Sequence, residues 1–286
     1  MAACAPVAGP NDPPESSAAG IPVAGENDAP RIRIAGANGE EVFSFSESDL
    51  KELRIEPFAG IYSTINNWPT ARFYAAEGYP VIDILKAAGL ADTFQTVIFR
   101  AGDGYETALT KEQLLSPQFF FPRPGEDGDG AEPVFPVIAY RLREGSDDIA
   151  AIRDDDPYLI IGQRNAFEHT NPAFVVGVTE ILTDDSPCEV WPEAGVFPAP
   201  GPIAPGETVK LQHPDFGLVK LHYTIDGSTP TLLSPMYNPS TYRPELNKPI
   251  TITEPTVIKA IASGYGKQDS GVAVFEFIPV VYTVSR

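Results

Sequence analysis

The chain has 286 residues and a net charge of -19, with 39 acidic against 20 basic side chains. This length accommodates two domains that each bury a core. Most of the charge precedes residue 183, and such an acidic surface repels nucleic-acid phosphates and anionic lipid headgroups, so no nucleic-acid partner is expected. No apolar run approaches the roughly 20 residues that span a bilayer, so no transmembrane helix is predicted.

The first 30 residues are predicted to form a disordered tether, because they are rich in Pro, Ala, Gly and Ser and poor in bulky apolar residues. Ala2-Ala3-Cys4 resembles the end of a lipobox, whose cysteine is acylated in exported lipoproteins. No basic and apolar signal regions precede it. Two interpretations therefore stay open, a lipid anchor at Cys4 or an incidental cysteine. Neither Cys4 nor Cys188 has a neighbour at zinc-ligand spacing, and no metal site is predicted.

The segment from residue 31 to 182 is predicted to open with a hairpin. Residues 31–34 and 41–45 alternate polar and apolar side chains around a Gly-Ala-Asn-Gly turn at 36–39. The clearest helical pattern spans residues 79–89, where Pro80 suits the first turn and one face is apolar.

Short strands and brief helices continue from there. Ser46 or Ser48 is placed to cap one more short helix, and the Thr110–Gln113 pair is placed to cap another. The further strands are expected at residues 93–101, 105–109, 134–143, 158–161 and 173–182. Antiparallel strands interrupted by helices predict an α+β domain over residues 31–182.

Five segments of this domain follow one order. They are residues 78–90, 97–109, 139–142, 157–162 and 178–181. That order resembles the molybdopterin-binding domain of the sulfite oxidase group. The resemblance implies a sulfite-oxidase-like α+β fold and, if the activity is kept, a molybdopterin-dependent oxidoreductase.

The residues that would carry this chemistry depart from the family pattern. The resemblance implies a metal-binding cysteine in the segment 58–68, which contains none, and Ser63 or Thr64 is the nearest replacement. Arg100 and Arg164 are the cations available for the pterin phosphate. Soft thiolate sulfur is the ligand that suits molybdenum, so loss of catalysis on a retained scaffold is the simpler interpretation, with no cofactor and no catalytic residue expected.

A second candidate surface combines amides and aromatic rings. Asn66, Asn67, Trp68 and Tyr74 are candidate ligand-binding residues, because rings stack on sugars and amides bind hydroxyl groups. Burial of these aromatic residues in the core is the competing interpretation. His169 is interpreted as a hydrogen-bonded loop histidine.

Two acidic runs are interpreted as solvated loops rather than calcium sites. Residues 126–130 lack the spaced ligands and the terminal Glu of an EF-hand, and residues 154–156 are interpreted in the same way.

Residues 183–205 are predicted to link this domain to a second one over 206–286, because they concentrate Asp, Pro and Gly. In the second domain Asp226-Gly227 is predicted to form a tight hairpin between strands. The alternating run 256–261 predicts a further strand.

The run Tyr223-Thr-Ile-Asp-Gly-Ser-Thr-Pro230, followed by Lys259-Ala-Ile-Ala262 and Ser270, resembles the C-terminal domain of chitobiases and β-hexosaminidases. The resemblance implies an all-β immunoglobulin-like sandwich that accompanies another domain and carries no catalytic residue.

The leading prediction is a non-catalytic cell-surface or secreted module for binding or assembly. Its partner would be a cell-wall glycan or another surface protein. The alternatives are a divergent molybdopterin-dependent oxidoreductase and a carbohydrate-binding surface protein.

Overall fold

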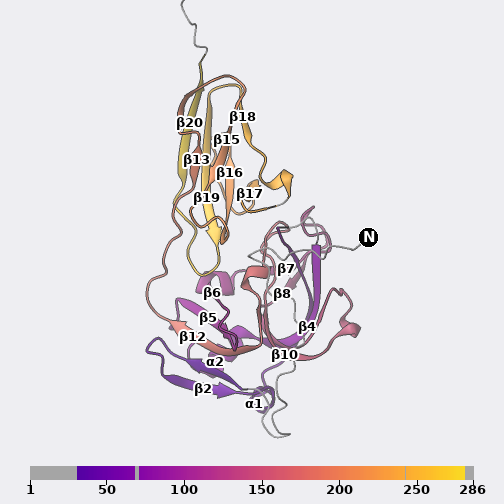
Figure 1. Ribbon diagram of the computed structural model, residues 1–286. Helices are drawn as coiled ribbons and strands as arrows, with labels where there is room; N and C mark the ends of the chain where they lie inside the picture. Colours follow the sequence, from indigo (N-terminus) through magenta and orange to yellow (C-terminus); the bar gives the residue numbers. More distant parts are fainter. Residues whose placement is uncertain (1–30, 68–70, 242, 281–286) are drawn as a thin grey trace, which may run out of the picture. The chain divides into compact units, whose positions relative to one another are not determined.

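The computed structural model describes residues 31–67, 71–241 and 243–280 (Figure 1). These residues divide into two compact units. The first contains residues up to Asn66 together with 71–185, and the second contains Asn67 and the residues from Ser186 onward. The predicted tether, Cys4 and Trp68 lie outside the described residues.

One sheet of the first unit has the strand order β2-β1-β12-β5-β6. Its strands are β1 (Ile32–Ala35), β2 (Glu41–Phe45), β5 (Thr96–Ala101), β6 (Glu106–Thr110) and β12 (Val178–Asp184). The hairpin of β1 and β2 confirms the expected opening pair. Strand β1 also pairs in parallel with β12, so the two ends of this unit meet in one sheet.

The other large sheet has the order β11-β10-β9-β4-β3 and is antiparallel throughout. Its strands are β3 (Phe58–Ile65), β4 (Ala71–Pro80), β9 (Val137–Glu144), β10 (Arg153–Ile160) and β11 (Val175–Val176). A short pair, β7 (Gln118–Phe120) with β8 (Glu132–Val134), forms a separate two-stranded sheet. The segment expected as one strand at 173–182 is divided between β11 and β12, which belong to different sheets.

The α-helices are too short to form a layer. They are α1 (Glu47–Glu52), α2 (Val81–Ala87) and α3 (Lys111–Leu115), accompanied by the 3-10 turns η1 (Ile149–Ala151), η2 (Asn171–Ala173) and η3 (Pro244–Leu246). The local predictions are confirmed, because Ser46 and Thr110 each complete a capping box. The fold-class prediction is wrong: the chain is 46% strand and 11% helix in five sheets, and no sulfite-oxidase-like α+β fold is indicated. The helices have one or two turns each and lie in the connections between strands.

The second unit is built from two sheets. The strand orders are β13-β15-β18 and β14-β20-β19-β16-β17. The strands are β13 (Gly195–Phe197), β14 (Gly201–Ile203), β15 (Glu207–Gln212), β16 (Val219–Thr224), β17 (Met236–Tyr237), β18 (Ile250–Ile252), β19 (Thr256–Gly264) and β20 (Ala273–Pro279) (Figure 1). Strands β13 and β14 lie within the range 183–205 that was expected to be a linker.

The core of the second unit draws alternate residues from both of its sheets. Val209 and Leu211 come from β15, while Leu221 and Ile258 come from β16 and β19. Apolar side chains facing inward at every second position form the interior of a β-sandwich. None of the described helices is long and apolar enough to cross a membrane.

The Asp226-Gly227 turn differs from the prediction. Strand β16 ends at Thr224 and its partner β17 begins only at Met236, so the dipeptide opens a long connection and the tight hairpin was a wrong prediction. Gly227 has φ +80, while Asp226 uses its carboxylate to accept bonds from the Ser228 amide and hydroxyl at 3.0 and 2.6 Å. These bonds make an Asx turn, and its central residue is left-handed here, a conformation that glycine adopts without steric cost.

We expect Gly227→Ala to lower the free energy of unfolding of the second unit by about 1 kcal/mol, because a Cβ in the left-handed region is strained. No atom lies within 4 Å of the position that this Cβ would take, so the cost is conformational rather than steric. Gly227→Asn is the matched control and should cost less, since asparagine tolerates this region. Equal stability of all three proteins in urea unfolding would contradict this account of the turn.

The buried tyrosines of the first unit lead us to expect that its folded state loses stability at alkaline pH. Burial raises the pKa of each of them, and for Tyr74 to about 12. They are Tyr62, Tyr74, Tyr79, Tyr105, Tyr140 and Tyr158. Unfolded tyrosine has a pKa of about 10, so stability is complete below pH ~10 and is lost as the pH rises toward ~12.

Absorbance at about 295 nm, where tyrosinate absorbs, checks this expectation. In the folded chain most of the signal should arise only with unfolding, whereas in denaturant all tyrosines should titrate near pH 10. Coincident titration curves in the two states would contradict the predicted burial of the phenols.

Candidate functional site

Ser63 and Thr64 lie near the end of β3, and both side chains are fully buried. The Ser63 hydroxyl donates to Gln163 Oε1 at 2.5 Å and accepts from the Phe121 amide at 2.8 Å. Thr64 Oγ1 accepts from the Thr170 amide at 2.9 Å and donates to the Ile65 carbonyl at 3.0 Å. Both hydroxyl groups are therefore engaged by the protein itself.

Gln163 is the partner that brings the following loop to β3. Its Nε2 donates to the Glu168 carbonyl at 2.8 Å and to the Ala166 carbonyl at 3.3 Å. Its backbone exchanges hydrogen bonds with Phe119 at 2.8 and 3.0 Å. One buried side chain thus fixes the loop 163–168 against both β3 and β7.

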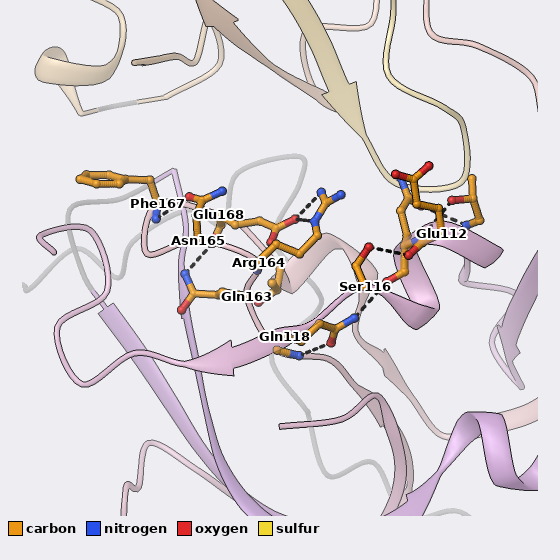
Figure 2. Close-up of polar contacts among 12 residues, drawn as sticks. Glu112, Ser116, Gln118, Gln163, Arg164, Asn165, Phe167 and Glu168 are labelled. Carbon is orange, nitrogen blue, oxygen red and sulfur yellow. Dashed lines mark hydrogen bonds and ion pairs between the residues drawn. The ribbon is translucent and has the colours of Figure 1, made fainter. Parts of the chain in front are cut away.

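Arg164 forms an ion pair within that loop. Its Nε donates to Glu168 Oε1 at 2.7 Å, and its backbone amide donates to the other oxygen of the same carboxylate (Figure 2). The two side chains are only 17% and 10% exposed. The Glu168 carboxylate already neutralises the charge of the guanidinium, so Arg164 is poorly suited to bind a phosphate group.

Arg100 does not join this cluster. It lies on β5 in the other sheet, where it forms ion pairs with Glu106 at 3.0 Å and with Glu180 at 2.6 Å. The hydrogen bond to Glu106 is the main cause that raises the pKa of Arg100. The structure therefore brings together Ser63, Thr64 and Arg164 but not the second predicted cation.

The amide and aromatic candidates are mostly buried. Tyr74 is 2% exposed and packs edge-on against Phe174, with ring centroids 5.3 Å apart, so neither ring face is open to a sugar. Asn66 is likewise buried. Asn67 belongs to the second unit, where its Oδ1 accepts from Asn238 at 2.9 Å. Tyr74 is therefore a core residue.

The remaining charged candidates form no metal site. His169 is buried. In the acidic loop 126–130, Arg123 binds Asp127 at 2.9 Å, and this hydrogen bond is the main cause that lowers the pKa of Asp127. The described part of the chain holds no group of three or more His, Cys, Asp or Glu side chains that could bind a metal ion.

An apolar groove of about 390 Å³ lies elsewhere on the first unit, and the sequence analysis missed it. Its walls come from α2, from α3 and the residues after it, and from the end of β8. The lining includes Ile82, Leu114, Leu115, Pro117, Phe119, Pro133, Val134, Phe135 and Pro136. The signal was present in the sequence, because prolines enclose the three phenylalanines of residues 117–122 and the single phenylalanine of residues 133–136.

The floor of the groove depends on a close approach of two segments. A Cβ on Gly162 would overlap the side chain of Val134, so glycine lets β8 lie against the end of β10. Leu115 and Phe135 on the walls remain 49% and 51% exposed. Large apolar side chains that stay half exposed on both sides of a hollow are typical of a binding surface.

The two polar side chains in this groove are already satisfied. The Ser116 hydroxyl donates to the Glu112 carbonyl at 2.7 Å (Figure 2). Gln118 donates to the Gln113 carbonyl at 3.0 Å and accepts from the Gly162 amide at 2.8 Å. A ligand of this groove would therefore be held mainly by apolar contact.

Comparison with known families gives a match within the second unit. A family described as Fn3 associated matches residues 209–277, which supports the C-terminal β-sandwich. No curated protein matches the chain. The comparisons give no support for the expected molybdopterin-binding domain.

The buried hydroxyls predict a structural rather than a chemical role. Ser63→Ala leaves the Gln163 oxygen and the Phe121 amide without their partner, so we expect a loss of about 1–3 kcal/mol in the free energy of unfolding. Thr64→Val should cost a similar amount. Thr251→Val, at an exposed position of β18, is the matched control and should be nearly neutral. Thermal unfolding measures all three, and unchanged stability of Ser63→Ala would show that the hydroxyl is not needed for folding.

Proposed function

We propose that this chain is a non-catalytic binding module. The first unit binds an apolar segment in the groove of Leu115 and Phe135, and the second unit is an accessory sandwich that positions it. The module acts outside the cell, as a secreted or surface-attached protein. A lipid anchor at Cys4 would place it at the membrane.

The observation that carries the proposal is the contrast between two regions of the first unit. At the end of β3 the hydroxyls of Ser63 and Thr64 and the charge of Arg164 are engaged by Gln163, Thr170 and Glu168. Groups that are fully hydrogen-bonded inside the protein are poor nucleophiles or ligands for an outside molecule. The groove, in contrast, leaves apolar surface open to solvent.

The oxidoreductase alternative is not carried forward. Its expected α+β fold is wrong, and the segment 58–68 provides no thiolate. The two arginines expected to hold a pterin lie on separate elements and are each paired with glutamate. The proposed module needs no cofactor.

A protein partner fits the groove better than a glycan. Sugar rings present many hydroxyl groups, and each one that is buried without a partner costs binding energy. The polar side chains of the groove, Ser116 and Gln118, already bond within the protein. Apolar side chains of another surface protein meet no such cost.

Binding of the neutral apolar dye Nile red tests the groove directly. We expect the folded chain to enhance the dye's fluorescence and Leu115→Ser to weaken binding about fivefold, because about 1 kcal/mol of apolar contact is lost. Leu53→Ser is the matched control, since Leu53 is 50% exposed and also ends a short helix. Equal dye binding by both variants would contradict the proposed site.

A further inference from the structure

The groove lies in an acidic stretch of the chain. Residues 111–136, which provide most of its lining, contain two basic and five acidic side chains, a net charge of -3. Both of these cations already interact with other residues of the chain. Lys111 lies over the Phe94 ring at 5.2 Å, and Arg123 binds Asp127 at 2.9 Å. The field around the groove is therefore negative.

Two carboxylates are placed at the borders of the groove. Glu112 lies on α3 one turn before Leu115, and residues at this spacing share a helix face. Glu132 directly precedes Pro133 on β8. Both glutamates are exposed, and neither has an ion-pair partner among the residues that the structure describes. They are available to a cation brought by a partner.

We propose that the occupant of the groove is an extended segment of another protein in which apolar anchor residues are flanked by lysine or arginine. This inference rests on the proposed function, because it names the partner of the same groove. The anchors fill the hollow of Leu115 and Phe135, while the flanking cations meet Glu112 and Glu132. Charge complementarity of this kind sets specificity and association rate more than affinity.

The same charge argument disfavours the other occupants. A second copy of the chain carries a net charge of -19 and would be repelled. The segment before Arg31 contains four acidic residues and no Lys or Arg. Anionic lipid and nucleic acid meet the same repulsion.

The lining also favours an extended conformation of the partner. The groove is lined by three prolines and two phenylalanines, namely Pro117, Pro133, Pro136, Phe119 and Phe135. Grooves lined by aromatic residues and proline bind polyproline II segments, whose backbone is already extended and loses little entropy. Proline and leucine are therefore the anchors to test.

Three synthetic decapeptides test the proposal by fluorescence anisotropy with the full chain. The first has the core Pro-Leu-Pro-Pro-Leu-Pro with two lysines at each end. The second has the same core with two glutamates at each end. The third keeps the lysines and replaces both leucines with serine.

We expect only the first peptide to bind well, with the second at least about tenfold weaker. Raising the ionic strength to about 1 M, where the Debye length is about 3 Å, should weaken the first peptide. The double variant Glu112→Gln with Glu132→Gln should weaken it about 2- to 20-fold. Glu52→Gln, an exposed helix glutamate on α1, is the matched control and should bind like the native chain.

The outcomes separate this inference from the proposed function. If lysine- and glutamate-flanked peptides bind equally and Leu115→Ser weakens both, the groove stands as a binding site and the cationic partner is overturned. Equal binding of the serine peptide also overturns the inference, because binding would then be electrostatic alone. If neither leucine peptide binds, the proposed occupant is overturned, and the Nile red experiment decides whether the groove binds apolar groups.

Discussion

The buried hydrogen bond between Ser63 and Gln163 is the interaction on which the first unit depends. Polar side chains in an interior must find partners, and these two residues, 100 positions apart, satisfy one another while also holding Phe121 and the Glu168 carbonyl. Strand β3, the β7–β8 pair and the loop after β10 are joined at this point. Residues of the same β7–β8 pair line part of the groove, so the buried polar cluster holds in place a pair of strands that the groove needs.

Local features of the fold were predictable from the sequence, and the tertiary arrangement was not. The first hairpin and both capping boxes follow from short-range patterns, in which turn residues and Ser or Thr act within four positions. The α+β prediction failed because α2 buries Val81, Ile84 and Leu85 over only seven residues, which gives a clear helical pattern without a helical layer. The Asp226-Gly227 prediction identified the left-handed glycine correctly and paired the wrong strands around it.

The candidate site shows the same limit. Ser63, Thr64 and Arg164 were selected by the resemblance to the molybdopterin-binding family, and two of their partners, Gln163 and Thr170, are polar residues that the resemblance did not single out. Hydrogen-bond partners a hundred residues apart leave no periodic signal in a sequence. The proline and phenylalanine runs of the groove did leave a signal, but composition alone does not tell whether such residues face a core or a hollow.

The parallel pairing of β1 with β12 has a consequence for the order of folding. Arg33 lies opposite Glu180, 147 residues later. Strand β1 therefore cannot complete its pairing until β12, the last strand of the unit, has been synthesised. During synthesis, the β1–β2 hairpin emerges early with one edge unpaired, and unpaired edges invite aggregation. Contacts of such long sequence separation also slow folding. A ribosome-bound chain that ends before residue 178 therefore exposes this edge and needs protection from aggregation.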